Sequence, residues 1–203
     1  HLGFVDFNPC LGIRTPRFHR GIPRPIPRAA LDQLLAQDDC NQRDWTVLGA
    51  YAGLRASDVV GLYPEDFVHS DAGDGLSLSG KGKIEKVIPA HARVVEALER
   101  QARKQGRARC QASCEAVCVH TRGPFFRMPS SNLSTMWAGW AAKITGETYR
   151  FHQLRHRFAT DVYQLSGQDL LVTRDMLRHA SVVTTQVYAQ VEPERAFKVV
   201  GDL

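Results

Sequence analysis

Apolar residues along this chain recur mainly at the three- and four-residue intervals of an α-helix. Residues 28–37 show the pattern through Leu31 and Leu34, and residues 43–54 form a second, strongly apolar stretch. The same spacing predicts a short helix near residues 57–62 and longer helices near residues 91–106, 130–143, 151–165, 169–178 and 181–190. We therefore expect a mainly α-helical domain.

One region between these helices has the two-residue alternation of a β-strand instead. Residues 75–79 alternate apolar and polar positions, as a half-buried strand does. Residues 80–83, Gly-Lys-Gly-Lys, have the composition of a turn, and residues 87–89, Val-Ile-Pro, form the return strand. The pattern predicts an α+β fold with a small antiparallel hairpin on one edge.

The leading segment differs from the rest of the chain. Residues 1–27 hold five of the ten prolines, which fix the backbone dihedral φ and do not continue a helix. Residues 1–28 also carry most of the net charge of +5, because they contain five arginines and a single acid. We expect residues 1–27 to be a basic linker and the compact domain to begin near Arg28. The basic charge fits either a solvated linker or a contact with nucleic acid.

The overall composition is that of an ordinary globular domain. Apolar residues make up 43% and charged residues 23% of the 203 positions. No apolar run has the length of a membrane span, and no signal peptide precedes the domain. We therefore expect no membrane partner and a location in the bacterial cytoplasm or nucleoid, or in the host cell if the chain is phage-encoded.

The five cysteines are an odd number, and we expect free thiols. Cys110, Cys114 and Cys118 recur at every fourth position, with His120 nearby, so a metal cluster is an alternative. The spacing matches no known zinc pattern, and Cys118 falls in an apolar, strand-like run, which argues against it. The prediction is that this chain binds no metal.

Four short polar segments carry the candidate chemistry. They are Gly-Leu-Arg-Ala-Ser-Asp around Arg55, the Gly-Lys-Gly turn around Lys81, His-Gln-Leu-Arg-His at residues 152–156, and Leu-Arg-His-Ala-Ser around His179, which Tyr188 follows nine residues later. Each segment alone is explained as well by a surface or core residue. Together they occur in one domain, in order and with suitable gaps, and this joint pattern favours a shared site.

The four segments resemble the signature of the tyrosine recombinases, also called the phage integrase family, over residues 28–190. The resemblance implies the catalytic-domain fold of that family. It also implies a set of site residues: Arg55, Lys81, His152, Arg155, His179 and the nucleophile Tyr188, with Asp58 in support where the family usually has Glu. Two positions next to site residues depart from the family pattern. Gln153, after His152, stands where the family often has Asp, and Arg178, before His179, stands where it often has Gly.

The resemblance implies that DNA is cut and rejoined through a 3′-phosphotyrosine. Arg55 and Arg155 would clamp the non-bridging phosphate oxygens, which suits two guanidiniums that stay charged. Tyr188 would attack the phosphorus, and Tyr149 is its main rival. The remaining roles implied are Lys81 as general acid, His152 as acceptor of the tyrosine proton and His179 as donor to a phosphate oxygen. Energy kept in the phosphotyrosine makes ATP and other cofactors unnecessary.

The same resemblance implies partners and a larger assembly. The substrate would be a double-stranded DNA attachment or recombination site, contacted outside the centre by Lys83, Arg14, Arg17 and Arg20. The family's N-terminal core-binding domain is absent from these residues, and accessory DNA-bending or directionality factors are further expected partners. Residues 191–203 would pack on a neighbouring protomer in a tetramer or fold back on their own core, and both arrangements stay open.

Three functional hypotheses remain at this point. The first is site-specific recombination, with a phage or mobile-element integrase favoured by the Ala- and Arg-rich composition. A type IB topoisomerase shares the same chemistry but would relax supercoils without exchanging partners. A DNA-binding module without catalysis is the alternative from another class, and the complete set of polar residues argues against it.

Overall fold

The computed structural model describes residues 10, 12, 23–38, 40–71, 73–79, 85–104, 123–179 and 182–188. Several sequence-based predictions concern residues outside these ranges. They are the turn with Lys81 and Lys83, the leading arginines Arg14, Arg17 and Arg20, the cysteines Cys110, Cys114 and Cys118 with His120, and the segment 191–203.

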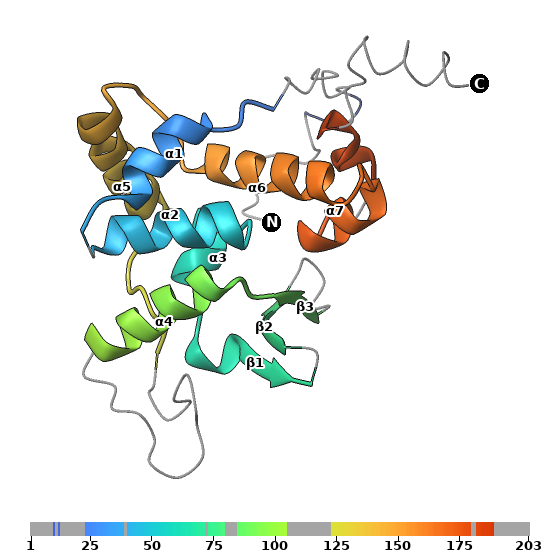
Figure 1. Cartoon of the computed structure of the whole chain (residues 1–203), viewed down its shortest axis with the longest axis horizontal. Coiled ribbons are helices and arrows are strands. Elements are labelled where there is room, and N and C mark those ends of the chain that lie inside the picture. The colour runs from blue at the N-terminus through green and yellow to red at the C-terminus, as the bar shows by residue number, and fades with distance from the viewer. Residues whose placement is uncertain are drawn as a thin grey trace.

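The described chain is mainly helical, as the apolar spacing predicted. Its α-helices are α1 (Arg28–Leu35), α2 (Asn41–Tyr51), α3 (Ala56–Val60), α4 (Ala92–Lys104), α5 (Ser130–Thr145), α6 (His152–Leu165) and α7 (Leu170–Met176). Helix α2 is central and contacts α1, α4, α5 and α6. In Figure 1, α6 crosses one side of α2 and leads to α7, while α4 lies on the other side. None of the helices in the described ranges is long and apolar enough to cross a membrane.

The core is built where α5 and α6 pack against α2. Trp45 of α2 and Trp137 of α5 are both fully buried. The indole N–H of Trp137 donates to the Thr46 hydroxyl at 2.8 Å, so the polar atom of Trp137 is hydrogen-bonded within the core. Gly49 lets α6 approach closely, because a Cβ at this position would lie 2.9 Å from the Leu154 side chain. This close packing fixes α6 relative to the end of α2.

A three-stranded antiparallel sheet, in the order β1-β2-β3, lies at one edge of the described chain. Strands β2 (Gly73–Ser79) and β3 (Glu85–Pro89) are the two arms of the predicted hairpin, and Leu76 pairs with Ile88. Strand β1 (Phe67–Ser70) was not predicted, because only one of its four residues is buried and so short a strand shows no clear alternation. Lys86 of β3 contacts Asp175 of α7 at 3.4 Å.

The structure adds two details near the ends of the domain to the sequence-based expectation. The helix expected over residues 181–190 is wrong for its described part, which forms two 3₁₀ turns, Val182–Thr184 and Gln186–Tyr188. The β-branched run Val-Val-Thr-Thr at residues 182–185 explains this, since such side chains crowd the preceding helical turn. The compact fold also includes Ile26, which is fully buried and donates its N–H to the Gln153 carbonyl at 3.3 Å.

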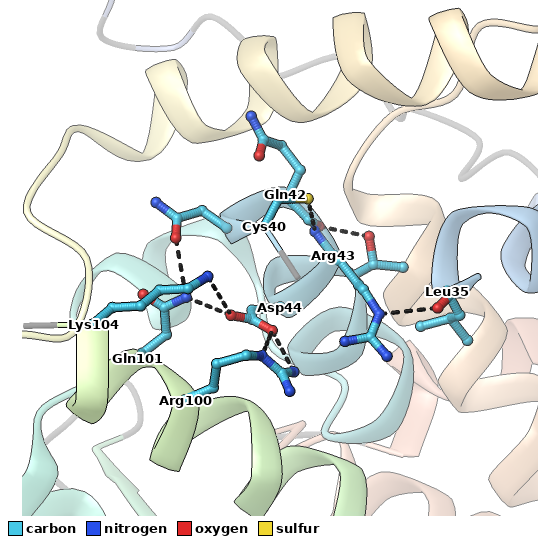
Figure 2. A network of polar contacts seen from close by, with 10 residues as sticks. Leu35, Cys40, Gln42, Arg43, Asp44, Arg100, Gln101 and Lys104 are labelled. Carbon is cyan, nitrogen blue, oxygen red and sulfur yellow. Dashed lines mark hydrogen bonds and ion pairs between the residues drawn. The ribbon is translucent and has the colours of Figure 1, made fainter. Parts of the chain in front are cut away.

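Helices α2 and α4 are joined through a buried carboxylate. Asp44 is fully buried, and Figure 2 shows side chains of α4 gathered around it. Arg100 donates to one carboxylate oxygen at 2.7 Å through Nη2 and 3.1 Å through Nε, while Gln101 donates to the other oxygen and Lys104 lies 4.0 Å from it. This polar network, which we call the Asp44 network, ties the central helix to the helix that follows the sheet.

Candidate active site

The turn between α2 and α3 presents Arg55. Gly53 adopts a φ of +61°, and a Cβ there would lie 2.4 Å from the Phe158 ring, so the turn requires glycine. Arg55 then caps α3 in extended conformation, and its N–H donates to the Asp58 carboxylate at 3.0 Å. The Arg55 guanidinium lies 3.9 Å from the same carboxylate, and 42% of its side chain is exposed. Asp58 therefore supports the arginine, and the guanidinium faces outward.

Arg155 lies beneath this turn, on the first turn of α6. Its residue is only 2% exposed, and its guanidinium donates to the main-chain carbonyls of Gly53 and Leu177. No carboxylate of the described ranges forms an ion pair with it. Burial, together with the charges of Arg55 and Arg178, lowers the pKa of Arg155 to about 9. The positive charge is thus poorly compensated, and an anion beside it would be strongly favoured.

Arg178 belongs to the same cluster, although sequence reasoning did not place it in the site. Its guanidinium donates to Asp58 at 2.5 Å, and its side chain is 4% exposed. The charge of Arg178 also acts on Arg155. Arg55 and Arg178 therefore both approach the Asp58 carboxylate, whose charge also acts on the buried Arg155. A charged residue where the family often has Gly was the available signal.

The hydroxyl of Tyr188 lies 2.7 Å from Nδ1 of His156. Burial raises the pKa of Tyr188, while the nearby charges of Arg155 and Arg55 oppose the rise. Burial, and then the charge of Arg155, lowers the pKa of His156, which favours a neutral imidazole able to accept a hydrogen bond. Sequence reasoning had assigned this contact to His152. The signal for His156 was its place one helical turn after His152, on the same face of α6.

His152 stands at the start of α6, with its ring edge-on to His156 at a centroid distance of 4.7 Å. Desolvation, followed by the neighbouring charges of His156, Arg155 and Arg55, lowers the pKa of His152 to about 4. The imidazole is therefore neutral at physiological pH. The described contacts connect His152 to the tyrosine through the ring of His156.

His179 follows Arg178 in the turn after α7. Its Nδ1 lies 3.0 Å from the hydroxyl of Thr185, which is fully buried between the two 3₁₀ turns. This contact connects His179 to the segment that carries Tyr188. The predicted histidine and tyrosine are therefore held by one short, hydrogen-bonded stretch.

An open cleft of about 650 Å³ adjoins the cluster. It is formed by the start of α3, one face of α5 and the segment that leads into α6. Its polar lining consists of Arg55, Ser57, Ser130, Ser134, Thr135, Arg150 and His152. The described lining contains basic and hydroxyl side chains and no acid, which suits a phosphate backbone.

Two other predicted positions can be placed. Tyr149, the rival nucleophile, is 7% exposed and donates its hydroxyl to Glu147 at 2.5 Å. Gln153 uses its side-chain oxygen to accept the Arg150 N–H at 2.7 Å, and so supports the turn before His152 in spite of replacing an acid. Within the described ranges, no group of three or more His, Cys, Asp or Glu side chains is arranged to hold a metal ion.

The comparison with known proteins identifies the family. The profile described as "Phage integrase family" matches residues 28–195. The chain belongs to the phage integrase family. It is 30% identical over 202 residues to the tyrosine recombinase XerC of Actinobacillus pleuropneumoniae, covering 96% of this chain and 63% of that protein. The chain thus spans less than two thirds of the length of that relative.

Solved structures of recombinases share the fold of this chain. The crystal structure of XerA recombinase superimposes with a TM-score of 0.64 at 22% identity, covering 93% of this chain and 66% of that one. XerH site-specific recombinase, bound to its difH substrate in a pre-cleavage complex, gives 0.63 at 18% identity, with coverage of 89% and 55%. The predicted fold class, a mainly helical recombinase catalytic domain with a small antiparallel sheet, is confirmed.

Proposed function

We propose that this chain is the catalytic part of a tyrosine recombinase, which cuts and rejoins DNA at specific sites through a 3′-phosphotyrosine. The observation that carries the proposal is the buried charge of Arg155, which forms no ion pair with a carboxylate of the described ranges and acts on the Tyr188 hydroxyl. The charges of Arg55 and Arg155 both act on Tyr188, although the three residues come from distant segments. A buried cation next to a nucleophilic oxygen is suited to an anionic electrophile such as a phosphodiester.

Two guanidiniums bind the scissile phosphate in this proposal. Arg55 approaches from the cleft side, since its side chain is half exposed, and Arg155 supports the phosphate from beneath. The attack of an oxygen on phosphorus increases the negative charge on the non-bridging oxygens. Donors fixed in advance stabilise that charge without reorganisation during the reaction. His179 is the third proposed donor to these oxygens.

The tyrosine proton has a direct route to His156. As the bond between the Tyr188 oxygen and phosphorus forms, the hydroxyl proton passes to Nδ1 of His156, 2.7 Å away. The lowered pKa of His156 leaves its imidazole neutral and ready to accept the proton. His152, edge-on to His156, orients that ring. This assignment moves the acceptor from His152, as the family resemblance implied, to its neighbour on the helix.

The bond from phosphorus to the 5′-oxygen breaks, and the leaving oxygen needs a proton. Lys81 is the proposed donor, and it stands in the segment between strands β2 and β3. Lys86 of β3 lies 3.4 Å from Asp175 of α7, the helix that precedes His179. This supports a position of the hairpin on the active-site side of the domain. Religation reverses the same proton transfers, so the reaction needs no ATP.

The proposed substrate is double-stranded DNA, and the proposed active form is a tetramer. The recombinase XerH is described as bound to its difH substrate, which supports DNA for this fold. Curated relatives are named tyrosine recombinases, and several are called XerC. A phage or mobile-element role, the contacts of Lys83, Arg14, Arg17 and Arg20, and accessory factors stay predictions. Alone, the catalytic part should bind DNA weakly and with a steep salt dependence.

Trapping the covalent intermediate on a nicked duplex tests the proposal. Duplexes with candidate attachment sites are incubated with the wild type, Tyr188→Phe and the control Tyr163→Phe, and then separated on a denaturing gel. We expect adducts with the wild type and Tyr163→Phe, and none with Tyr188→Phe, which should still bind DNA. Adducts formed by Tyr188→Phe but lost in Tyr149→Phe would instead assign the nucleophile to Tyr149.

The same material separates the other two hypotheses. A two-site recombination assay and a supercoil-relaxation assay are run in parallel. Strand exchange supports a recombinase, whereas relaxation by the monomer without exchange supports a type IB topoisomerase. Binding of every duplex without an adduct from any of them would indicate a DNA-binding module and overturn the proposal.

A further inference from the structure

Arg178 combines two costly features. Its backbone φ is +54°, in the left-handed region that residues other than glycine rarely adopt. Its charged side chain is only 4% exposed, and its Nε is buried without a hydrogen-bond partner in the part of the chain that the structure describes. Such features persist where a specific contact holds them in place.

That contact is the carboxylate of Asp58. Nη2 of Arg178 donates to Oδ2 of Asp58 at 2.5 Å, across 120 positions of sequence. The same oxygen accepts the N–H of Arg55 at 3.0 Å and lies 3.9 Å from the Arg55 guanidinium. One carboxylate oxygen therefore joins the turn after α7 to the start of α3.

One of these two segments carries an arginine of the proposed phosphate clamp, and the other supports the second arginine. The segment at α3 presents Arg55 itself. The turn after α7 supplies the Leu177 carbonyl that accepts from Arg155, and then continues into His179. The contact between Arg178 and Asp58 thus fixes the distance between the two halves of the site.

The contact also sets where the charge of Arg55 can act. With Arg178 in place, Asp58 is neutralised by a cation that is closer than Arg55 and almost fully desolvated. Without it, Arg55 is the cation left beside this carboxylate among the described ion pairs. Attraction in a partly buried site would draw the Arg55 guanidinium onto Asp58 and away from a phosphate.

We propose that Arg178 is a positioning residue, which neutralises Asp58 and so holds the Arg55 guanidinium free for the scissile phosphate. The inference rests on the proposed function and deepens it, by adding a residue that touches neither the DNA nor the nucleophile. Its effect should appear in the cleavage step and not in DNA affinity.

Single-turnover cleavage of the nicked duplex at saturating concentration tests this role. Arg178→Gly is the first variant, because glycine accepts the left-handed backbone and the fold should persist. We expect the rate constant for adduct formation to fall by about 10- to 100-fold, with a DNA Kd within about threefold of the wild type. Arg178→Lys should recover part of the rate, and the control Arg174→Gln, on the helix that precedes Arg178, should retain it.

The combination with Asp58→Asn decides between positioning and general damage. The double variant should be no slower than the slower single variant, because both changes remove one interaction. A rate for Arg178→Gly within twofold of the wild type, or losses that multiply in the double variant, would overturn the proposal. If the wild type itself forms no adduct, the proposed function fails. Urea unfolding of the wild type, the two single variants Arg178→Gly and Asp58→Asn, and the double variant then measures the coupling free energy between Arg178 and Asp58. Absence of coupling there would remove the link between the two segments.

Discussion

Among the described residues, the Asp44 network and the cluster around Asp58 both gather basic side chains about a buried or half-buried aspartate, and they differ in how their charges are paired. In the Asp44 network, both oxygens of a fully buried carboxylate face donors from α4, which are Arg100, Gln101 and Lys104. Both cations of this network therefore lie beside a carboxylate. Around Asp58, two arginines, Arg55 and Arg178, approach one carboxylate, and the buried Arg155 of the same cluster donates to main-chain carbonyls instead. The cations of the first cluster all pair with a carboxylate, whereas the second cluster contains a buried arginine, Arg155, that pairs with none in the described ranges.

The difference separates a structural role from a chemical one. A buried charge whose partners are all protein groups stabilises one arrangement of helices and offers nothing to a ligand. A buried cation without a carboxylate partner costs free energy in the DNA-free protein and gains when an anion arrives. Removing a residue from each cluster should therefore affect different measurements.

Asp44→Ala should have the largest effect on the fold. Loss of the carboxylate removes the buried acceptor that Arg100, Gln101 and Lys104 share, which should lower the free energy of unfolding by about 3–5 kcal/mol. Urea denaturation followed by circular dichroism measures the change. Asp32→Ala is the matched control, because Asp32 forms an exposed pair with Arg28, and its loss should cost less than about 1 kcal/mol. Equal effects of the two changes would erase the contrast between the clusters.

Arg155→Gln should reverse that pattern. The rate of adduct formation should fall by about 100- to 1,000-fold, because a preorganised donor to the phosphate is lost. The free energy of unfolding should change by less than about 2 kcal/mol, since the glutamine amide still donates and an unfavourable buried charge disappears. Arg157→Gln, on the same helix but paired with Asp161, is the control and should keep the rate. Strong destabilisation by Arg155→Gln with an intact cleavage rate would assign this arginine to the fold.

The pH dependence of stability should show a smaller effect. The pKa of His152 is about 4 in the folded chain and 6.5 for a solvated histidine, so the unfolded chain takes up its proton first as the pH falls. Stability is therefore complete above pH 6.5 and declines towards pH 4. Because His152 is partly exposed to solvent, we expect a loss of about 1 kcal/mol between about pH 7 and pH 5. Urea titrations of the wild type and His152→Gln should diverge over this interval and agree at about pH 7.5; parallel curves would contradict the assignment.

Much of the fold was predictable because apolar spacing is a local signal. The helices around Leu31, Trp45 and Leu154 follow from it, and so do strands β2 and β3. The short strand β1 and the two 3₁₀ turns around Thr185 were not predictable in this way. Four residues with one buried position carry too little pattern, and in residues 182–185 the β-branched side chains disfavour the helix that the apolar spacing predicts.

The site was predictable where the motif names a residue, and less so where packing selects one. Arg55, Asp58 and Arg155 were implied by the family resemblance, and the structure brings them together. His156 and Arg178 were missed, because their roles depend on which side chain reaches Tyr188 or Asp58 in space. The burial of Asp44 was also missed. Residues 41–44, Asn-Gln-Arg-Asp, are all polar and stand at the start of a helix, which is typical of a solvent-exposed position.

The Arg155 guanidinium is held by two main-chain carbonyls, and this interaction has a consequence for how the sequence of such a protein can change. Its acceptors are peptide oxygens, which every amino acid supplies, so this interaction does not depend on the chemical identity of the side chain at position 177. Only a change in the path of the chain would remove it, such as a deletion in either turn or a bulkier residue at Gly53. A library that aims at new DNA targets can therefore vary the surface around these turns widely, provided that it keeps their length and that glycine.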